Sequence, residues 1–277
     1  GSMLVVIMAL TAGTTLLMWI GERITENGIG NGISLIIFAG IVSRLPYGAQ
    51  SLLTYLQTGR ISVFNLLVTL VLALLVIAAI VWVIEGQRRI PVHYAKRVVG
   101  RKVYGGQNTH IPLRINQAGV IPVIFAASLL AFPATLAQFI SADWAQSLQQ
   151  WLSFGSPFYL VTYAALIIFF TYFYTSVTFN PQDVADNIKK YGGFIPGIRP
   201  GRPTAQYLGK VLERITLAGA LFLAAISILP VFFGPLTNIP NLYFGGTALL
   251  IVVGVSLETM KQIEAHLLMR NYQGFMK

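Results

Sequence analysis

Apolar residues are grouped along the chain into seven long runs separated by polar connections. A helix needs roughly 18 or more apolar residues to cross the hydrocarbon core of a membrane, and most of the runs reach that length. The runs lie at about residues 3–20, 33–45, 62–84, 118–140, 157–179, 215–233 and 243–257. The pattern predicts an all-α, polytopic transmembrane bundle of seven helices.

The second and the last runs differ from the others. The second is short before Arg44, so hydropathy alone supports its crossing least. The last continues into the amphipathic stretch LETMKQIEAHLLMRNYQ, which carries Glu258, Lys261, Glu264 and Arg270. We expect this tail to leave the bilayer as part of the same helix.

The composition agrees with a membrane protein. Of the 277 residues, 55% are hydrophobic and only 10% are charged, whereas about a quarter of a soluble domain is charged. The absence of cysteine excludes disulfides, thiolate metal sites and cysteine nucleophiles. His93, His110 and His266 do not have the spacing of metal ligands. We therefore expect no catalytic group, no metal site and no cofactor.

The chain begins Gly-Ser-Met and enters apolar sequence at once. A signal peptide would have a basic first segment and a small-residue cleavage site. Gly-Ser-Met is typical of a cloning remnant, so we expect the chain to be a fragment of a longer protein.

Lysine and arginine are distributed very unevenly between the two sets of connections. Basic residues mark cytoplasmic loops. If every run crosses the membrane, 17 of the 19 lie on one side, including seven at 84–117 and six at 180–214. Only Arg44 and Arg60 lie on the other side. The asymmetry predicts a cytoplasmic C-terminus and supports seven crossings, because omitting the short second run would mix the two sides.

Glycine and asparagine interrupt the chain just before the second run, in ENGIGNGIS (26–34). These residues permit a tight turn, and either Asn31 or Ser34 can cap the helix that follows. Ile33 and Ile37 are four residues apart and share one helical face. Their spacing leaves open whether they pack in a core, face lipid, or form an apolar constriction that excludes water and ions.

The run that begins NQAGVIPVIF contains Pro122 and Pro133. Each proline removes a backbone hydrogen bond and can bend the helix. Packing is the usual reason for such a bend, although a bend also suits a helix that moves against its neighbours. Asn116, at the cytoplasmic end, can cap the helix, which is the simpler interpretation, or hydrogen-bond across a helix interface.

The connections 85–117 and 180–214 are long and basic, and both contain structure-forming residues. The second includes GFIPGIRPGRPT (193–204), where proline fixes φ and glycine frees it. This composition predicts a defined, non-helical tip that presents Arg199 and Arg202. Topological charge and attraction to anionic lipid explain the number of cations. A docking surface for an acidic protein or for RNA explains the length of the connections better.

Five blocks, in order, give the chain a specific resemblance to the SecY family, the channel-forming subunits of the bacterial Sec translocon. The blocks are MWIGERITENGIGNGISLIIFAGIV, GQRRIPVHYAKR, THIPLRINQAGVIPVIFA, FNPQDVADNIKKYGGFIPGIRPG and YFGGTALLIVVG. The resemblance implies two pseudo-symmetric halves of five helices around an hourglass pore. This chain is similar to the fourth to the tenth helix, with the first three helices missing.

The resemblance also implies a division of the chain. Residues 1–46 would be the last two helices of the N-terminal half, and 47–61 an external loop. Residues 62–277 would be the C-terminal half, with cytoplasmic loops at 85–117 and 180–214.

Individual residues acquire expected roles from the resemblance. An apolar pore ring would be formed by Ile33, Ile37, Ile124 and Ile251. Asn116 and Pro122 would belong to the mobile lateral-gate helix. The SecA motor ATPase or the translating ribosome would dock on Arg88, Arg89, Arg101, Lys102, Arg199 and Arg202.

The expected function is a protein-conducting channel in the bacterial plasma membrane, without enzymatic activity. The resemblance implies SecE and SecG subunits, SecA, the ribosome, signal peptides, nascent chains and membrane lipids as partners. A solute transporter built from inverted repeats is the alternative. The absence of charged residues from the centres of the apolar runs speaks against it. An intramembrane enzyme would need a catalytic group, and the sequence offers no candidate.

Overall fold

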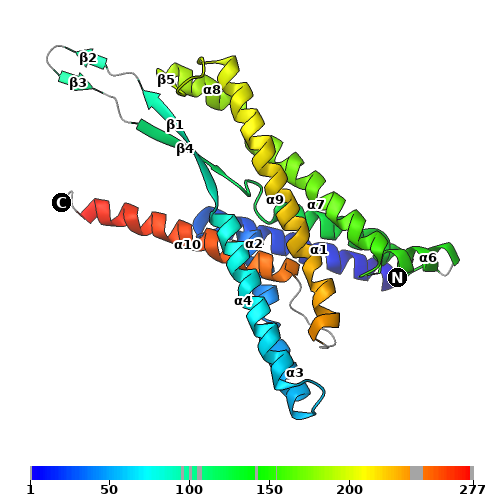
Figure 1. Cartoon of the computed structure of the whole chain (residues 1–277). Coiled ribbons are helices and arrows are strands. Elements are labelled where there is room, and N and C mark those ends of the chain that lie inside the picture. Colours follow the sequence, from blue (N-terminus) through cyan, green and yellow to red (C-terminus); the bar gives the residue numbers. More distant parts are fainter. Residues whose placement is uncertain are drawn as a thin grey trace. The chain divides into compact units, whose positions relative to one another are not determined.

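The computed structural model describes residues 2–94, 97–99, 102–104, 108–140, 143–153, 155–237 and 246–274. The chain separates into two compact units. Figure 1 labels their helices and strands. The first unit consists of Gly1–Val81 with Phe232–Lys277, and the second of Trp82–Val231. The division expected at residue 46 concerns two halves of a larger pore, so it stays a prediction.

The first unit is built from helices. They are α1 (Ser2–Asn27), α2 (Gly32–Val42), α3 (Leu45–Gln57), most of α4 (Val63–Glu85) and α10 (Gly246–Gly274). Helix α2 contacts both α1 and α10. Most of the segment expected as an external loop, 47–61, is helical; Pro46 lies in the first turn of α3, where proline is tolerated.

The second unit combines helices with two small sheets. Its helices are α5 (Ile121–Ala137), α6 (Asp143–Trp151), α7 (Pro157–Thr178), α8 (Pro181–Lys190) and most of α9 (Arg202–Thr237). Its strands are β1 (Gln87–Tyr94), β2 (Arg97–Val99), β3 (Lys102–Tyr104), β4 (Asn108–Arg114) and β5 (Gly193–Phe194). The strands form an antiparallel sheet in the order β4-β1-β5 and a separate β2–β3 pair.

The predicted membrane bundle is confirmed. In the described part of the chain, five helical segments are long and apolar enough to cross a membrane: Leu4–Asn27, Gly32–Gln57, Val63–Glu85, Pro157–Lys190 and Arg202–Phe232. Ile121–Ala137 is a shorter apolar helix. Together with the apolar start of α10, these segments match the seven predicted runs one for one. Helix α10 is continuous to Gly274, as expected for its amphipathic tail.

The structure decides between alternatives that the sequence leaves open for α5. Pro122 lies in the first turn of the helix, where a backbone N–H has no helical partner to lose, so it does not bend α5. Only Pro133 lies inside the helix. The N-terminal cap residue is Val120, so Asn116 does not cap α5.

Gly32 marks the closest approach between α1 and α2. A Cβ at Gly32 would lie 1.9 Å from the carbonyl oxygen of Gly21, whereas a Cβ at Gly40 of the same helix would meet nothing within 4 Å. We predict that Gly32→Ala separates the two helices and destabilises the protein by about 1–3 kcal/mol. Gly40→Ala is the matched control, and it should leave stability unchanged or slightly raised. Equal thermal unfolding midpoints for the two variants in detergent would contradict this packing.

Candidate functional site

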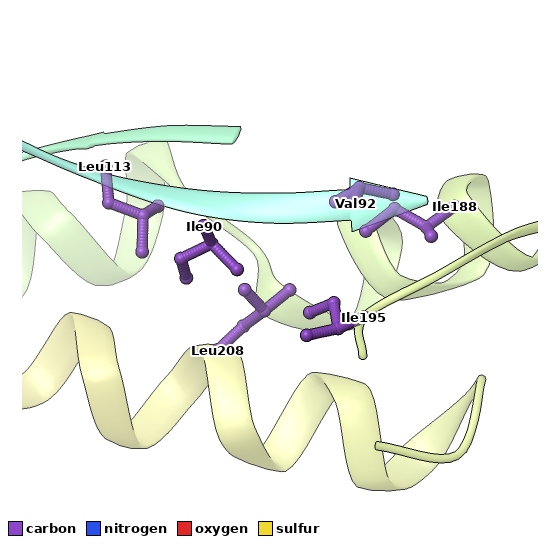
Figure 2. Packing of buried hydrophobic residues seen from close by; sticks show 6 residues of the cluster. All are labelled: Ile90, Val92, Leu113, Ile188, Ile195 and Leu208. Carbon is purple, nitrogen blue, oxygen red and sulfur yellow. The ribbon is translucent and has the colours of Figure 1, made fainter. Parts of the chain in front are cut away.

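The two basic connections fold together around one apolar core. We call β1, β4, α8, β5, the loop that follows β5, and the start of α9 the basic module. Its core consists of six buried side chains, shown in Figure 2: Ile90, Val92, Leu113, Ile188, Ile195 and Leu208. Leu208 of α9 points toward the sheet, and its exposed fraction is 0%. The structure therefore unites two connections that the sequence presents as separate loops.

Strand β1 forms because apolar and polar residues alternate along it. Ile90 and Val92 are buried, whereas Arg89 before them and Pro91 between them are exposed. Successive side chains of a strand point to opposite faces. Ile90 and Val92 therefore face the core while their neighbours face outward.

A very short strand joins the second connection to the first. Tyr94 of β1 pairs with Gly193 of β5, and His93 pairs with Phe194. A Cβ at Gly193 would lie 2.9 Å from the Tyr94 ring and 3.0 Å from the Ile188 side chain. Only glycine leaves room for this pairing.

The loop from 195 to 201 is the stiff tip that the sequence predicts, and its non-helical backbone is confirmed. Gly197 and Gly201 have φ values of 81° and 96°, which favour glycine. The hydroxyl of Thr204, itself only 1% exposed, donates a 2.8 Å hydrogen bond to the carbonyl oxygen of Arg199. Ile195 anchors the tip in the core. The backbone of Arg199 is therefore held firmly while its side chain remains exposed.

The other expected docking residues lie in different local settings. Arg202 is exposed, but it is the first residue of α9 and not part of the loop, because Pro203 fits a first helical turn. Arg88 and Arg89 are exposed neighbours on β1, so they point to opposite faces of the sheet. Lys102 lies in β3, and Arg101 lies outside the described residues.

Sequence reasoning missed Arg114 as a companion of Arg89. Arg114 is exposed on β4 and pairs with Gln87, which is two residues from Arg89 on β1. Residues with this pairing share one face of a sheet. Once its oxygen faces Arg89, the side-chain amide of Gln87 accepts from the guanidinium at 3.0 and 3.3 Å. The hairpin register, and not the local sequence, brings these groups together.

Three of the four expected pore-ring residues lie in the first unit. Ile33 and Ile37 are on α2, and Ile251 is on α10, which contacts α2. Ile37 lines a groove of about 550 Å³ whose wall is apolar apart from Arg44. Ile124 is on α5 in the second unit. The complete ring therefore stays a prediction.

Polar side chains accept hydrogen bonds from the backbone N–H groups in and after the turn before α2. Asn31 is the cap, because its side chain accepts a 3.1 Å hydrogen bond from the backbone N–H of Ser34. The hydroxyl oxygen of Thr25 accepts from the N–H of Gly32 at 2.9 Å. The side-chain oxygen of Gln262, on α10, accepts from the N–H of Gly30 at 2.6 Å. The turn thereby connects α1, α2 and α10.

The expected gate residues are both buried. Asn116 is 8% exposed, and within the described contacts its Oδ1 has no hydrogen-bond partner. The preceding backbone lies directly on α9, since a Cβ at Gly219 would be 2.5 Å from the carbonyl oxygen of Ile115. A buried polar atom without a partner costs on the order of 1–3 kcal/mol.

A protein-family model matches most of the chain. The SecY family model matches residues 1–260. The chain belongs to the SecY family. Both the basic module and all four expected ring residues lie within the matched region.

Curated SecY relatives cover nearly the whole chain. The protein translocase subunit SecY of Mycobacterium leprae is 52% identical over an alignment that covers 100% of this chain and 65% of the relative. That of Halalkalibacterium halodurans is 51% identical, covering 99% of this chain and 66% of the relative. The chain thus spans just under two thirds of the length of these SecY proteins.

Solved SecY-type channels share the fold. One is a SecY protein whose plug domain stabilises the closed state of the translocation channel; its TM-score is 0.65 at 21% identity, covering 91% of this chain and 64% of that one. Another is a protein-conducting channel with a TM-score of 0.60 at 19% identity, covering 91% of this chain and 63% of the other. At these identities the likeness concerns the fold alone.

Leu208 tests whether the basic module is one folded body. We predict that Leu208→Ala costs about 2–5 kcal/mol of module stability, because it opens a cavity among fully buried side chains. Amide hydrogen exchange should then rise in both β1 and α8, although they belong to different connections. Gln206→Ala, at an exposed position of the same helix, is the control. Faster exchange confined to 180–214 would show that the two connections fold independently.

Proposed function

We propose that this chain is the C-terminal part of a protein-conducting channel subunit. The channel moves unfolded secretory polypeptides across the bacterial plasma membrane and releases hydrophobic segments sideways into lipid. The observation that carries the proposal is the SecY family match over residues 1–260, with relatives that are protein translocase subunits. The chain performs no bond chemistry, so a partner supplies the energy.

The basic module is the docking surface for that partner. Arg199 stands on a loop whose backbone is fixed by glycine turns, a buried isoleucine and the Thr204 hydroxyl. A rigidly presented guanidinium loses little conformational entropy when it binds a carboxylate or a phosphate. This chemistry suits the SecA ATPase and ribosomal RNA. Arg202, Arg88, Arg89, Arg101 and Lys102 add positive charge to the same two connections.

The pore ring consists of Ile33, Ile37, Ile124 and Ile251. A narrow constriction lined by branched apolar side chains excludes water and ions by dewetting, yet it can widen around a passing polypeptide. The lateral gate contains α5, with Pro122 at its start and Asn116, whose Oδ1 has no hydrogen-bond partner among the described residues, just before it. A polar group of an entering signal peptide can satisfy that amide.

The complete channel needs further components. SecE and SecG subunits, membrane lipids and the first three helices of the SecY fold complete the channel around this chain. The positive charges of 84–117 and 180–214 orient the protein with its C-terminus in the cytoplasm.

Arg199→Glu tests the docking role. We predict that SecA binding to the complete translocase weakens about tenfold or more, because a charge-assisted hydrogen bond is replaced by repulsion. ATP-driven translocation of a secretory precursor should fall in parallel. Arg60→Glu, an exposed charge on the opposite side of the predicted topology, is the control. Unchanged SecA affinity in Arg199→Glu would mean that the arginines of the tip do not bind SecA and serve only to orient the protein in the membrane.

Ile37→Ser tests the ring. We predict a clear rise in resting ion conductance across planar bilayers that contain the complete translocase, because a hydroxyl weakens dewetting at the constriction. Leu75→Ser, at an exposed apolar position of α4, is the control for a polar substitution in a membrane helix. Equal conductance in the two variants would show that Ile37 is not part of the ring.

A further inference from the structure

Helix α10 carries a ring residue and a turn-binding residue on one face. Ile251 and Gln262 are separated by about three helical turns, so they lie on the same side of α10. Val255, between them on this face, is only 3% exposed. Because α10 is one continuous helix, the positions of Ile251 and Gln262 are fixed relative to each other.

Gln262 hydrogen-bonds to the turn that leads into α2. Its side-chain oxygen accepts the N–H of Gly30 at 2.6 Å. Gly30 has a φ of 89°, and a Cβ there would lie 3.3 Å from the hydroxyl of Thr259 and 3.3 Å from a methyl of Leu35. Residue 30 must therefore be small and left-handed, with its N–H directed at α10.

The same turn is fixed on its other side by α1. Gly32 donates to Thr25, and its Cα lies directly against the Gly21 carbonyl. The Cγ1 atom of Ile33 lies only 3.0 Å from the position that a Cβ of Gly21 would occupy. The start of α2 is thus held between two helices, by Thr25 on one side and Gln262 on the other.

The expected ring isoleucines follow this turn immediately. Ile33 is the second residue of α2, and Ile37 is one turn further along a rigid helix. A shift at Gly30 therefore moves both side chains relative to Ile251. The hydrogen bond from the Gly30 N–H to Gln262 joins the turn before α2 directly to α10, although the two are far apart in sequence.

We propose that Gln262 is a positioning residue that sets the register between α2 and α10 and thereby keeps the pore ring closed. This inference rests on the proposed channel function. Gln262 acts through the turn and does not itself contact the passing polypeptide. Movement of the polar end of α10 is transmitted through this hydrogen bond to Ile33 and Ile37.

The test compares three variants in the complete translocase reconstituted in planar bilayers. Gln262→Leu removes the acceptor at similar size, whereas Gln262→Glu keeps a side-chain oxygen at the same reach. His266→Leu is the matched control: it lies one turn further along α10, is exposed, and has no hydrogen bond among the described contacts. The readouts are resting ion conductance, precursor translocation and the thermal unfolding midpoint.

We expect Gln262→Leu to raise resting conductance about tenfold, the change in a closed-to-open ratio that the loss of one partly buried hydrogen bond produces. Gln262→Glu and His266→Leu should stay near the wild-type value. If Gln262→Leu fails to fold, Gln262→Asn takes its place, because its shorter side chain keeps polarity but does not reach Gly30.

Three results would overturn the inference while leaving the channel function intact: wild-type conductance in Gln262→Leu, equal leakage in His266→Leu, or Gln262→Glu as leaky as Gln262→Leu. If the wild-type translocase itself moved no precursor, the proposed function would fail first. The translocation readout therefore separates the two failures.

Discussion

Backbone N–H and C=O groups that lipid or protein shields from water must find a partner within the protein, because an unpaired buried group costs several kcal/mol. Most of this chain meets the requirement with long helices. The turn between α1 and α2 cannot, and side chains replace the missing helical partners. Asn31 serves the N–H of Ser34, Thr25 that of Gly32, and Gln262 that of Gly30. The hydrogen bonds that satisfy these backbone groups also hold α1, α2 and α10 against one another.

The basic module is held together by an apolar core and not by long membrane helices. Its strands and short helices suit a polar environment. Its six core side chains come from both basic connections. Leu208 of that core is on α9, which continues without a break into an apolar, membrane-length segment. A force applied at Arg199 therefore reaches the membrane part through a continuous helix and not through a flexible linker. This continuity agrees with the docking role proposed for the basic module.

Hydropathy predicts the apolar helices well because burial in lipid needs only composition and length. It places the start of α9 too late, since the stretch before residue 215 is amphipathic and buries Leu208 and Leu212 in the protein. Alternation around Ile90 signals a strand. No local sequence pattern, however, predicts the two-residue strand Gly193–Phe194 that pairs with β1. Tertiary packing decides such short elements.

The expected site residues divide in the same way. The glycine and proline content of the tip predicts a rigid Arg199, because φ preferences act locally. The opposite faces of Arg88 and Arg89, the pairing of Arg114 with Gln87, and the bond from Gln262 to Gly30 depend on contacts between distant segments. Motif resemblance supplies roles for ring residues, but it does not supply the hydrogen bond that holds two of them in place.

The most direct test of a polypeptide path through this chain is photo-cross-linking of an arrested precursor in the complete translocase. A photoreactive side chain would be placed at Ile37, at Ile251 and, as a control, at the exposed α4 position Leu74. The account predicts adducts with the arrested precursor from residues 37 and 251 and none from residue 74. Adducts from residue 74 alone, or from none of the three, would contradict it.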